Sequence, residues 1–282
     1  HIVRLNLILF LVFLTLPSCG IFIDGYDDHR SAKKFYKERN YHDAALYASR
    51  SLRQKPKNKK ALVLFENSYQ LAIEEHLSNI RTLEKIEDDS KWPELYYEYN
   101  DLQTLNDVLL TLEPIVLIEL NYQLNLPSKD YKDEMEMMRP LAAEFYYARG
   151  IEFVQNKEKE SQKSAARSFK SAMEFISDYK NSKDLYDESR SAALITLLIL
   201  PFEGDDNLVD YIRDKMMMAQ TNSSKEFLQI ITRDELSTVL IERNLVQAGI
   251  TENDYLEIGQ LSGANQILSA SLAITHRPAE TI

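Results

Sequence analysis

A helix, a tight turn and a second helix are predicted by the stretch SAKKFYKERNYHDAALYASRSLRQKP, which begins at Ser31. Its apolar and small residues follow a helical period, break near Asn40 and then resume. Ala44 and Ala48 are four residues apart and share one helical face, where small side chains let a neighbouring helix approach closely. Pro56 is expected to end the second helix. The space around the alanine contact is expected to be filled by Phe35, Tyr41 and Tyr47.

Composition agrees with a helical chain that has a buried core. Only 7 glycines and 8 prolines occur in 282 residues, which favours helices over turn-rich sheets. The chain is 44% hydrophobic and 27% charged, so it is not predicted to be disordered. Its formal charge of -11 argues against a non-specific grip on nucleic acid phosphates. The expected partner is therefore a protein or a small molecule.

This hairpin resembles the tetratricopeptide repeat. The resemblance rests on the spacing of Ala32, Phe35, Tyr41, Ala44, Ala48 and Pro56, and Ser51 stands where that family usually has alanine. A second match, with about three extra residues in the turn around 156–161, is carried by Tyr146, Gly150, Phe153, Ala165, Phe169 and Ala172. The resemblance implies a tetratricopeptide-like helical domain over residues 31–190.

The chain between the two matches is helix-forming but lacks clean repeat spacing. An amphipathic stripe is formed by Leu71, Leu77, Ile80, Leu83 and Ile86. A helix over residues 102–112 is predicted to follow an aromatic cluster made of Trp92, Tyr96, Tyr97 and Tyr99. Packing between helices is the expected role of these aromatic residues, with peptide or glycan binding as the alternative. Core filling is likewise expected of Met135, Met137 and Met138.

The amino terminus reads as a secretory signal. Arg4 precedes the apolar run LNLILFLVFLTL at residues 5–16, and small or turn-forming residues follow it. The run is shorter than the roughly 20 residues that a spanning helix needs. Cys19, the only cysteine of the chain, follows immediately in LPSCG and has no partner for an internal disulfide.

The stretch LPSCG resembles the lipid-attachment motif of bacterial lipoproteins, matched by Leu16, Ser18 and Cys19, with Pro17 as a less usual occupant. The resemblance implies a signal peptide over residues 1–18, cleavage before Cys19, acyl chains on that residue and a lipidated linker over residues 19–30. Two alternatives stay open. Residues 21–23 could extend the apolar run into an uncleaved anchor, or the segment could lie in a core. Because the chain begins at His1, a few earlier residues are expected to be missing.

Near residue 190 the pattern changes from helices to alternating strands and helices. The apolar run AALITLLILP at 192–201 predicts a buried strand, FEGDDN a turn, and residues 208–219 a helix. Further strands are predicted at 227–231 and 265–274, with helices at 234–247 and 254–261 between them. Such alternation predicts a partly parallel sheet layered with helices. The predicted fold class is thus α+β and multidomain, with helical hairpins followed by a smaller α/β domain.

About residues 195–275 resemble the α/β domain of the curli secretion component family (CsgG), which is related to the TolB amino-terminal domain. Matching positions are Pro201, Phe202, Arg233, Leu236, Leu240, Glu242, Leu245, Gly249, Gly259, Gly263 and Ala264. Asn265 replaces a common aspartate, and Ser269 replaces a frequent glycine. The resemblance implies a periplasm-facing module over residues 191–282, expected to be incomplete at Ile282, and pore formation is not carried over.

Catalytic, cofactor-binding and metal-binding motifs are not predicted. The five histidines show no pair at i, i+4 and have no cysteine partners, which gives a zinc site little support; they are His1, His29, His42, His76 and His276. The chain has no glycine-rich phosphate loop and no G-x-S-x-G. A solvated turn, rather than a cation site or acid pair, is expected of Glu203, Asp205 and Asp206. Arg233 and Glu242 are expected to form an exposed structural pair, with contact to a neighbouring subunit as the alternative.

Two classes of function remain open on the sequence. The first is a lipid-anchored, non-enzymatic adaptor on the periplasmic side of the bacterial outer membrane. Its helical hairpins would bind envelope proteins or peptides, and its α/β module would dock or oligomerise in a secretion or assembly complex. A lipoprotein regulator of cell-wall synthesis is the related alternative. The second class is an enzyme completed by residues beyond Ile282. The sequence does not name the partner-contact residues.

Cys19→Ala is expected to abolish lipid modification, because the thiol is the only acceptor in the predicted motif. The precursor should stay uncleaved or be mislocalised, as shown by mass spectrometry of its amino-terminal peptide and by membrane fractionation. A cleaved mutant that fractionates normally with membranes would rule out the lipoprotein hypothesis.

Overall fold

The computed structural model describes residues 26–199, 203–204, 206–218, 226–231, 264–268 and 271–272. Within them the protein is mostly helical and carries a small parallel sheet, which agrees with the α+β prediction. The signal segment, Cys19, Arg233, Glu242 and the predicted helices at 234–247 and 254–261 lie outside the described residues. The chain divides into two compact units, residues 1–142 and residues 143–282, called here the first and second units.

The predicted first hairpin is formed by α2 (Tyr26–Lys37) and α3 (Tyr41–Gln54). Its turn contains Arg39 in the left-handed conformation, with φ of 61°. Asn40 then caps α3, because its side-chain oxygen accepts a hydrogen bond from the Asp43 N–H at 3.1 Å. The helix ends at Gln54, and Pro56 follows two residues later, as predicted.

Small side chains lie at the centre of this hairpin, as the sequence predicted. Ala44 and Ala48 are both fully buried, and Ala32 of α2 is buried with them. The rings of Phe35 and Tyr47 stack beside the contact with their centroids 5.2 Å apart. Close helix approach and aromatic packing therefore fix this hairpin together.

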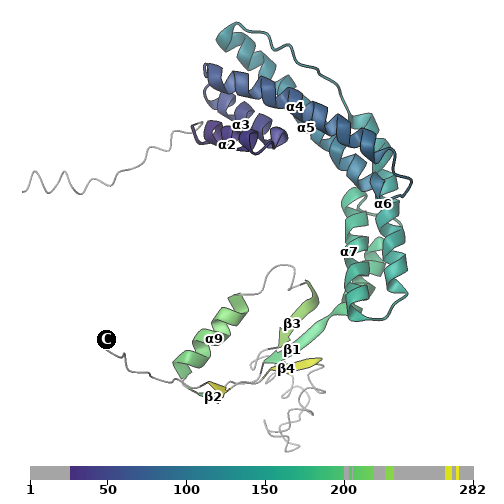
Figure 1. Ribbon diagram of the computed structural model, residues 1–282. Helices are drawn as coiled ribbons and strands as arrows, with labels where there is room; N and C mark the ends of the chain where they lie inside the picture. Colours follow the sequence, from purple (N-terminus) through teal and green to yellow (C-terminus); the bar gives the residue numbers. More distant parts are fainter. Residues whose placement is uncertain are drawn as a thin grey trace, which may run out of the picture. The chain divides into compact units, whose positions relative to one another are not determined.

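Two long antiparallel helices follow the hairpin and make up most of the rest of the first unit. α4 (Lys59–Leu83) and α5 (Lys91–Leu120) lie side by side (Figure 1). Between them and α3 lies one hydrophobic core, whose largest fully buried members include Phe65, Tyr69, Leu102, Leu105 and Leu109. The buried area of such side chains is the main favourable contribution to folding.

The predicted helix at 102–112 is only the middle of α5. The aromatic cluster before it belongs to the same helix, because Pro93 lies in the first turn, where no intrahelical N–H bond is required. α5 also continues through Pro114 to Leu120. Asn121 ends it in the left-handed conformation, with φ of 49°.

Residues 121–131 run back along α5 and are held by polar side chains. Gln103 Oε1 accepts from the Tyr131 N–H at 2.7 Å, and Asn106 Oδ1 accepts from Ser128 Oγ at 2.8 Å. Tyr69 Oη donates to the Pro127 carbonyl at 2.8 Å. Gln103 and Asn106 are buried, so these bonds satisfy polar groups that would otherwise destabilise the core.

The second predicted hairpin is formed by α6 (Lys132–Val154) and α7 (Lys159–Phe175). Gly150 of α6 faces the ring of Phe169, and the Tyr146 and Phe175 rings stack at 5.9 Å. Gln162 closes the turn by donating to the Asn156 carbonyl at 2.6 Å. α8 (Ser182–Ala193) packs against α7.

The chain changes from helix to strand after Ala193. β1 (Ile195–Ile199) lies between β3 (Leu228–Ile231) and β4 (Gln266–Leu268), and all three strands are parallel (Figure 1). The predicted strands at 192–201 and 227–231 are confirmed in shortened form. The helix predicted at 208–219 is α9 (Asp206–Met218).

The predicted strand at 265–274 is divided between two sheets. Its first part is β4, and its second part, β5 (Ser271–Leu272), pairs with β2 (Glu203–Gly204) instead. Helices and sheet of the second unit also share a buried cluster, made of Ala166 from α7, Ala193 from α8 and Phe227 before β3. The small sheet is therefore fixed against the helices that precede it.

Gly150→Ala is expected to lower the free energy of unfolding by about 1–3 kcal/mol, as overpacking does. An alanine Cβ would lie 2.5 Å from Phe169 Cε1, and Phe169 is fully buried and cannot easily move aside. This clash should outweigh the roughly 0.5–1 kcal/mol that alanine normally adds within a helix. Urea unfolding measures the change, with exposed Glu152→Ala as the control. Equal or higher stability of Gly150→Ala would contradict the predicted clash.

Candidate functional site

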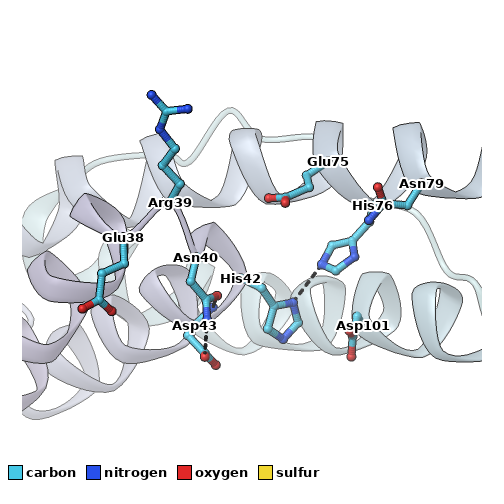
Figure 2. A pocket seen from close by; sticks show the side chains of 9 residues that line it. All are labelled: Glu38, Arg39, Asn40, His42, Asp43, Glu75, His76, Asn79 and Asp101. Atoms are coloured by element: carbon cyan, nitrogen blue, oxygen red, sulfur yellow. Dashed lines mark hydrogen bonds between the residues drawn. The ribbon is translucent and has the colours of Figure 1, made fainter.

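A polar pocket of about 660 Å³ opens on the first unit where α3, α4 and α5 meet. Figure 2 shows the side chains that line it. The turn before α3 contributes Glu38, Arg39 and Asn40, α3 contributes His42 and Asp43, α4 contributes Glu75, His76 and Asn79, and α5 contributes Asp101. We call it the two-histidine pocket.

The two histidines of the pocket face each other across the α3–α4 packing. His42 Nδ1 and His76 Nε2 are 3.1 Å apart, and the rings meet edge to face at 88° (Figure 2). His76 is buried because it lies on the same face of α4 as Ala72 and Ile80, four residues before and after it. His42 is half-buried in the first turn of α3, next to the cap at Asn40.

A carboxylate behind His76 sets the tautomer of its neutral ring. Glu98 Oε2 lies 2.6 Å from His76 Nδ1, and Glu98 Oε1 accepts from Asn79 Nδ2 at 2.9 Å. An ionised carboxylate only accepts hydrogen bonds, so Nδ1 carries the proton. In the neutral ring, Nε2 is then an unprotonated nitrogen directed at His42.

Asp101 completes a cluster of three potential ligands. One atom each from His42, His76 and Asp101 lies within 4.8 Å of the other two. The set offers two imidazole nitrogens and one carboxylate oxygen, which are common ligands of divalent metal ions.

The surroundings favour a cation in this pocket. Four carboxylates line it, from Glu38, Asp43, Glu75 and Asp101. Arg39 is the cationic residue among the lining residues that the structure describes, and Figure 2 shows its guanidinium extending away from the histidines. Burial lowers the pKa of His42, which the Asp101 carboxylate opposes and His76 reinforces.

This pair was not predicted from the sequence, because two histidine ligands were expected to lie four residues apart on one helix. His42 and His76 are 34 residues apart and belong to different helices. One signal was present: His76 occupies a position in the apolar row of an amphipathic helix, where a polar side chain needs a partner. Of the other histidines, His29 lies on α2, and His1 and His276 lie outside the described residues.

The remaining candidate residues do not converge on a second site in the described part of the chain. Glu203 begins β2 and Asp206 begins α9, and Asp205 lies outside the described residues. Trp92 and Tyr99 of the aromatic cluster pack against the core as expected, whereas Tyr97 is 45% exposed. Of the methionines, Met138 contacts the core and Met137 is 65% exposed.

Asn265, the residue before β4, joins β4 to β1. Its Oδ1 accepts from the Thr196 N–H at 3.0 Å and from Lys159 Nζ at 3.2 Å. Its own N–H donates to the Thr196 carbonyl at 2.8 Å. The amide side chain thus extends the strand pairing by one step and ties it to α7.

The second half of α5 carries an exposed apolar row opposite its buried face. Leu110, Leu117 and Ile118 are 50%, 51% and 79% exposed, and exposed Pro114 lies between them. Their spacing of four, seven and eight residues from Leu110 places them on one side of the helix. We call these four residues the α5 stripe. Exposed apolar patches of this kind are typical of binding surfaces.

Comparisons with protein-family models, curated proteins and solved structures found no match to this chain. None of the helices in the described part of the chain combines the length and apolar character needed to span a bilayer.

Glu98→Leu is expected to lower the free energy of unfolding by about 1–3 kcal/mol, because the buried Nδ1–H of His76 would lose its acceptor. Glu98→Gln keeps an acceptor oxygen for the His76 N–H and should lower the free energy of unfolding by less than Glu98→Leu. Urea unfolding of the two variants, each compared with the parent chain, measures the difference. Equal losses would mean that the hydrogen bond to His76 does not matter for stability.

Proposed function

We propose that this chain is a lipid-anchored, non-enzymatic adaptor in a bacterial cell-envelope secretion or assembly complex. The α5 stripe is the observation that carries the proposal, because three large apolar side chains are presented to solvent by a helix whose other face is fully packed. On that other face Leu109, Leu112 and Val116 are fully buried. A partner would therefore meet a preformed surface and would not have to order it.

The partner that fits the α5 stripe best is an amphipathic helix with basic residues beside its apolar face. The stripe residues follow the spacing i, i+4, i+7 and i+8, which is typical of a helix surface that binds the apolar face of another helix. Glu113 and Glu119 flank the row on α5, and the chain as a whole carries a charge of -11. Complementary charge speeds association and selects the partner. Burial of each half-exposed leucine of the stripe by a partner contributes about 1 kcal/mol to the free energy of binding.

The helical hairpins support the adaptor role through their resemblance to tetratricopeptide repeats. In such repeats stacked helix pairs present extended surfaces to peptides and proteins. In the second hairpin Gly150 of α6 faces the ring of Phe169 on α7, and both residues carry the resemblance. In the first hairpin the resembling alanines Ala32, Ala44 and Ala48 are all buried.

The cellular setting of the proposal comes from the sequence. A lipid on Cys19 would hold the chain at the outer membrane, facing the periplasm, with residues 19–30 as the linker. The α/β module that resembles the CsgG and TolB families would dock or oligomerise in the complex.

Ile118→Asp and Leu117→Asp in the full-length, epitope-tagged chain should each weaken the capture of one specific partner from gently solubilised membranes at least tenfold, about 1.4 kcal/mol. A buried carboxylate facing apolar anchors has no compensating contact. Met137→Asp is the matched control, since Met137 is exposed but lies on α6, outside the stripe.

Quantitative mass spectrometry of the captured proteins measures the loss, followed by direct titration of the purified partner. Recovery of secretion or assembly components that depend on the stripe supports the adaptor. Stripe-dependent recovery of cell-wall synthases supports the regulator instead. Equal recovery by all three variants would contradict the assignment of the α5 stripe as the binding surface.

A further inference from the structure

We propose that His42, His76 and Asp101 bind a divalent transition-metal ion of the Zn²⁺ class in the two-histidine pocket. The proposal is independent of the adaptor function, because no residue of the α5 stripe belongs to this cluster.

The donor set matches the preferences of Zn²⁺. Two neutral imidazole nitrogens and one carboxylate oxygen are borderline to hard ligands, and three protein ligands leave a fourth tetrahedral position for water. Two nitrogens each bound at about 2.0–2.1 Å to a tetrahedral ion are separated by about 3.3 Å. His42 Nδ1 and His76 Nε2 are 3.1 Å apart, which is close to this separation. A carboxylate oxygen of Asp101 lies within 4.8 Å of the histidine ligand atoms and must approach them further to complete the set.

The groups behind the histidines match a metal site as well. Ligating histidines typically donate their second ring N–H to a carboxylate, which fixes the tautomer and raises the basicity of the other nitrogen. Glu98 accepts from His76 Nδ1 at 2.6 Å in this way, and Asn79 holds the second oxygen of Glu98 at 2.9 Å. Glu98 is a positioning residue and is not counted among the ligands.

A purely structural histidine pair would not require this arrangement. Two unprotonated ring nitrogens repel each other at this distance. In the metal-free pair one of the two nitrogens must therefore carry a proton and donate it in a hydrogen bond to the other. A metal ion replaces that proton and also draws in Asp101, which the histidine–histidine hydrogen bond leaves unused. Four carboxylates along the pocket add an attractive field for the ion.

Binding would cross-link three helices of the first unit. His42 comes from α3, His76 from α4 and Asp101 from α5, so the complete ligand set exists only when these helices are packed together. An ion that binds the folded state alone raises its stability by mass action. A bound ion would therefore stabilise the packing of the first hairpin against α4 and α5.

The test uses the full-length chain in mild detergent, stripped of metal with a chelator and titrated with Zn²⁺ against a competing fluorescent indicator. The parent chain should bind one ion and melt at a higher temperature with Zn²⁺ than without it. His42→Asn and Asp101→Asn should each weaken binding about 100-fold or more and remove the thermal shift. Both positions are half-buried, and circular dichroism without metal verifies that the variants fold.

Two further variants distinguish binding at this specific site from non-specific binding of Zn²⁺ to surface residues. Glu98→Gln should weaken Zn²⁺ binding roughly 10–100-fold while keeping one ion per chain, as loss of a supporting carboxylate does. His29→Asn is the matched control, because His29 is a partly buried histidine of the same unit outside the pocket. Its affinity should equal that of the parent chain.

A Co²⁺ titration reports the ligands directly, since its visible ligand-field absorption should appear with the parent chain and His29→Asn and be absent with Asp101→Asn. The proposal is overturned if folded His42→Asn and Asp101→Asn bind Zn²⁺ as tightly as the parent chain. It is equally overturned if His29→Asn reduces the affinity as much as they do. Neither result would bear on partner capture by the α5 stripe.

Discussion

Packing between α4 and α5 is the contact on which the first unit depends. Phe65 and Tyr69 of α4 are fully buried with Leu102, Leu105 and Leu109 of α5, and α3 covers the same core. Because α5 extends to Leu120, its second half also presents the α5 stripe on the opposite side. One packed face thus holds the helix rigid while the other remains available to a partner.

Polar side chains complete this core at its edges. Gln103 and Asn106 bind the backbone and side chains of residues 121–131, and the Tyr69 hydroxyl reaches the same segment. At the other end of the helix pair, Glu98 binds His76 and thereby directs its second nitrogen into the two-histidine pocket. The proposed metal site is in this sense a continuation of the core, in which satisfying one buried histidine prepares a ligand.

The helices and the sheet of the second unit depend on each other. Phe227, just before β3, packs against Ala166 and Ala193 of the preceding helices, and Arg167 lies over its ring at 5.5 Å. Lys159 of α7 also reaches the Leu194 carbonyl and Asn265, which connect to β1 and β4. The change in secondary structure after α8 therefore takes place within one compact unit.

The sequence by itself determined the local elements. Helical periodicity predicted both hairpins, Asn40 and Pro56 marked the bounds of α3, and apolar runs predicted β1 and β3, because these signals act between near neighbours in the chain. Tertiary structure decided what distant neighbours do: β5 pairs with β2 and not with the sheet of β4, and His42 meets His76 and Asp101. Periodicity shows which face of a helix is buried, but only the packing of three helices decides which side chains meet there.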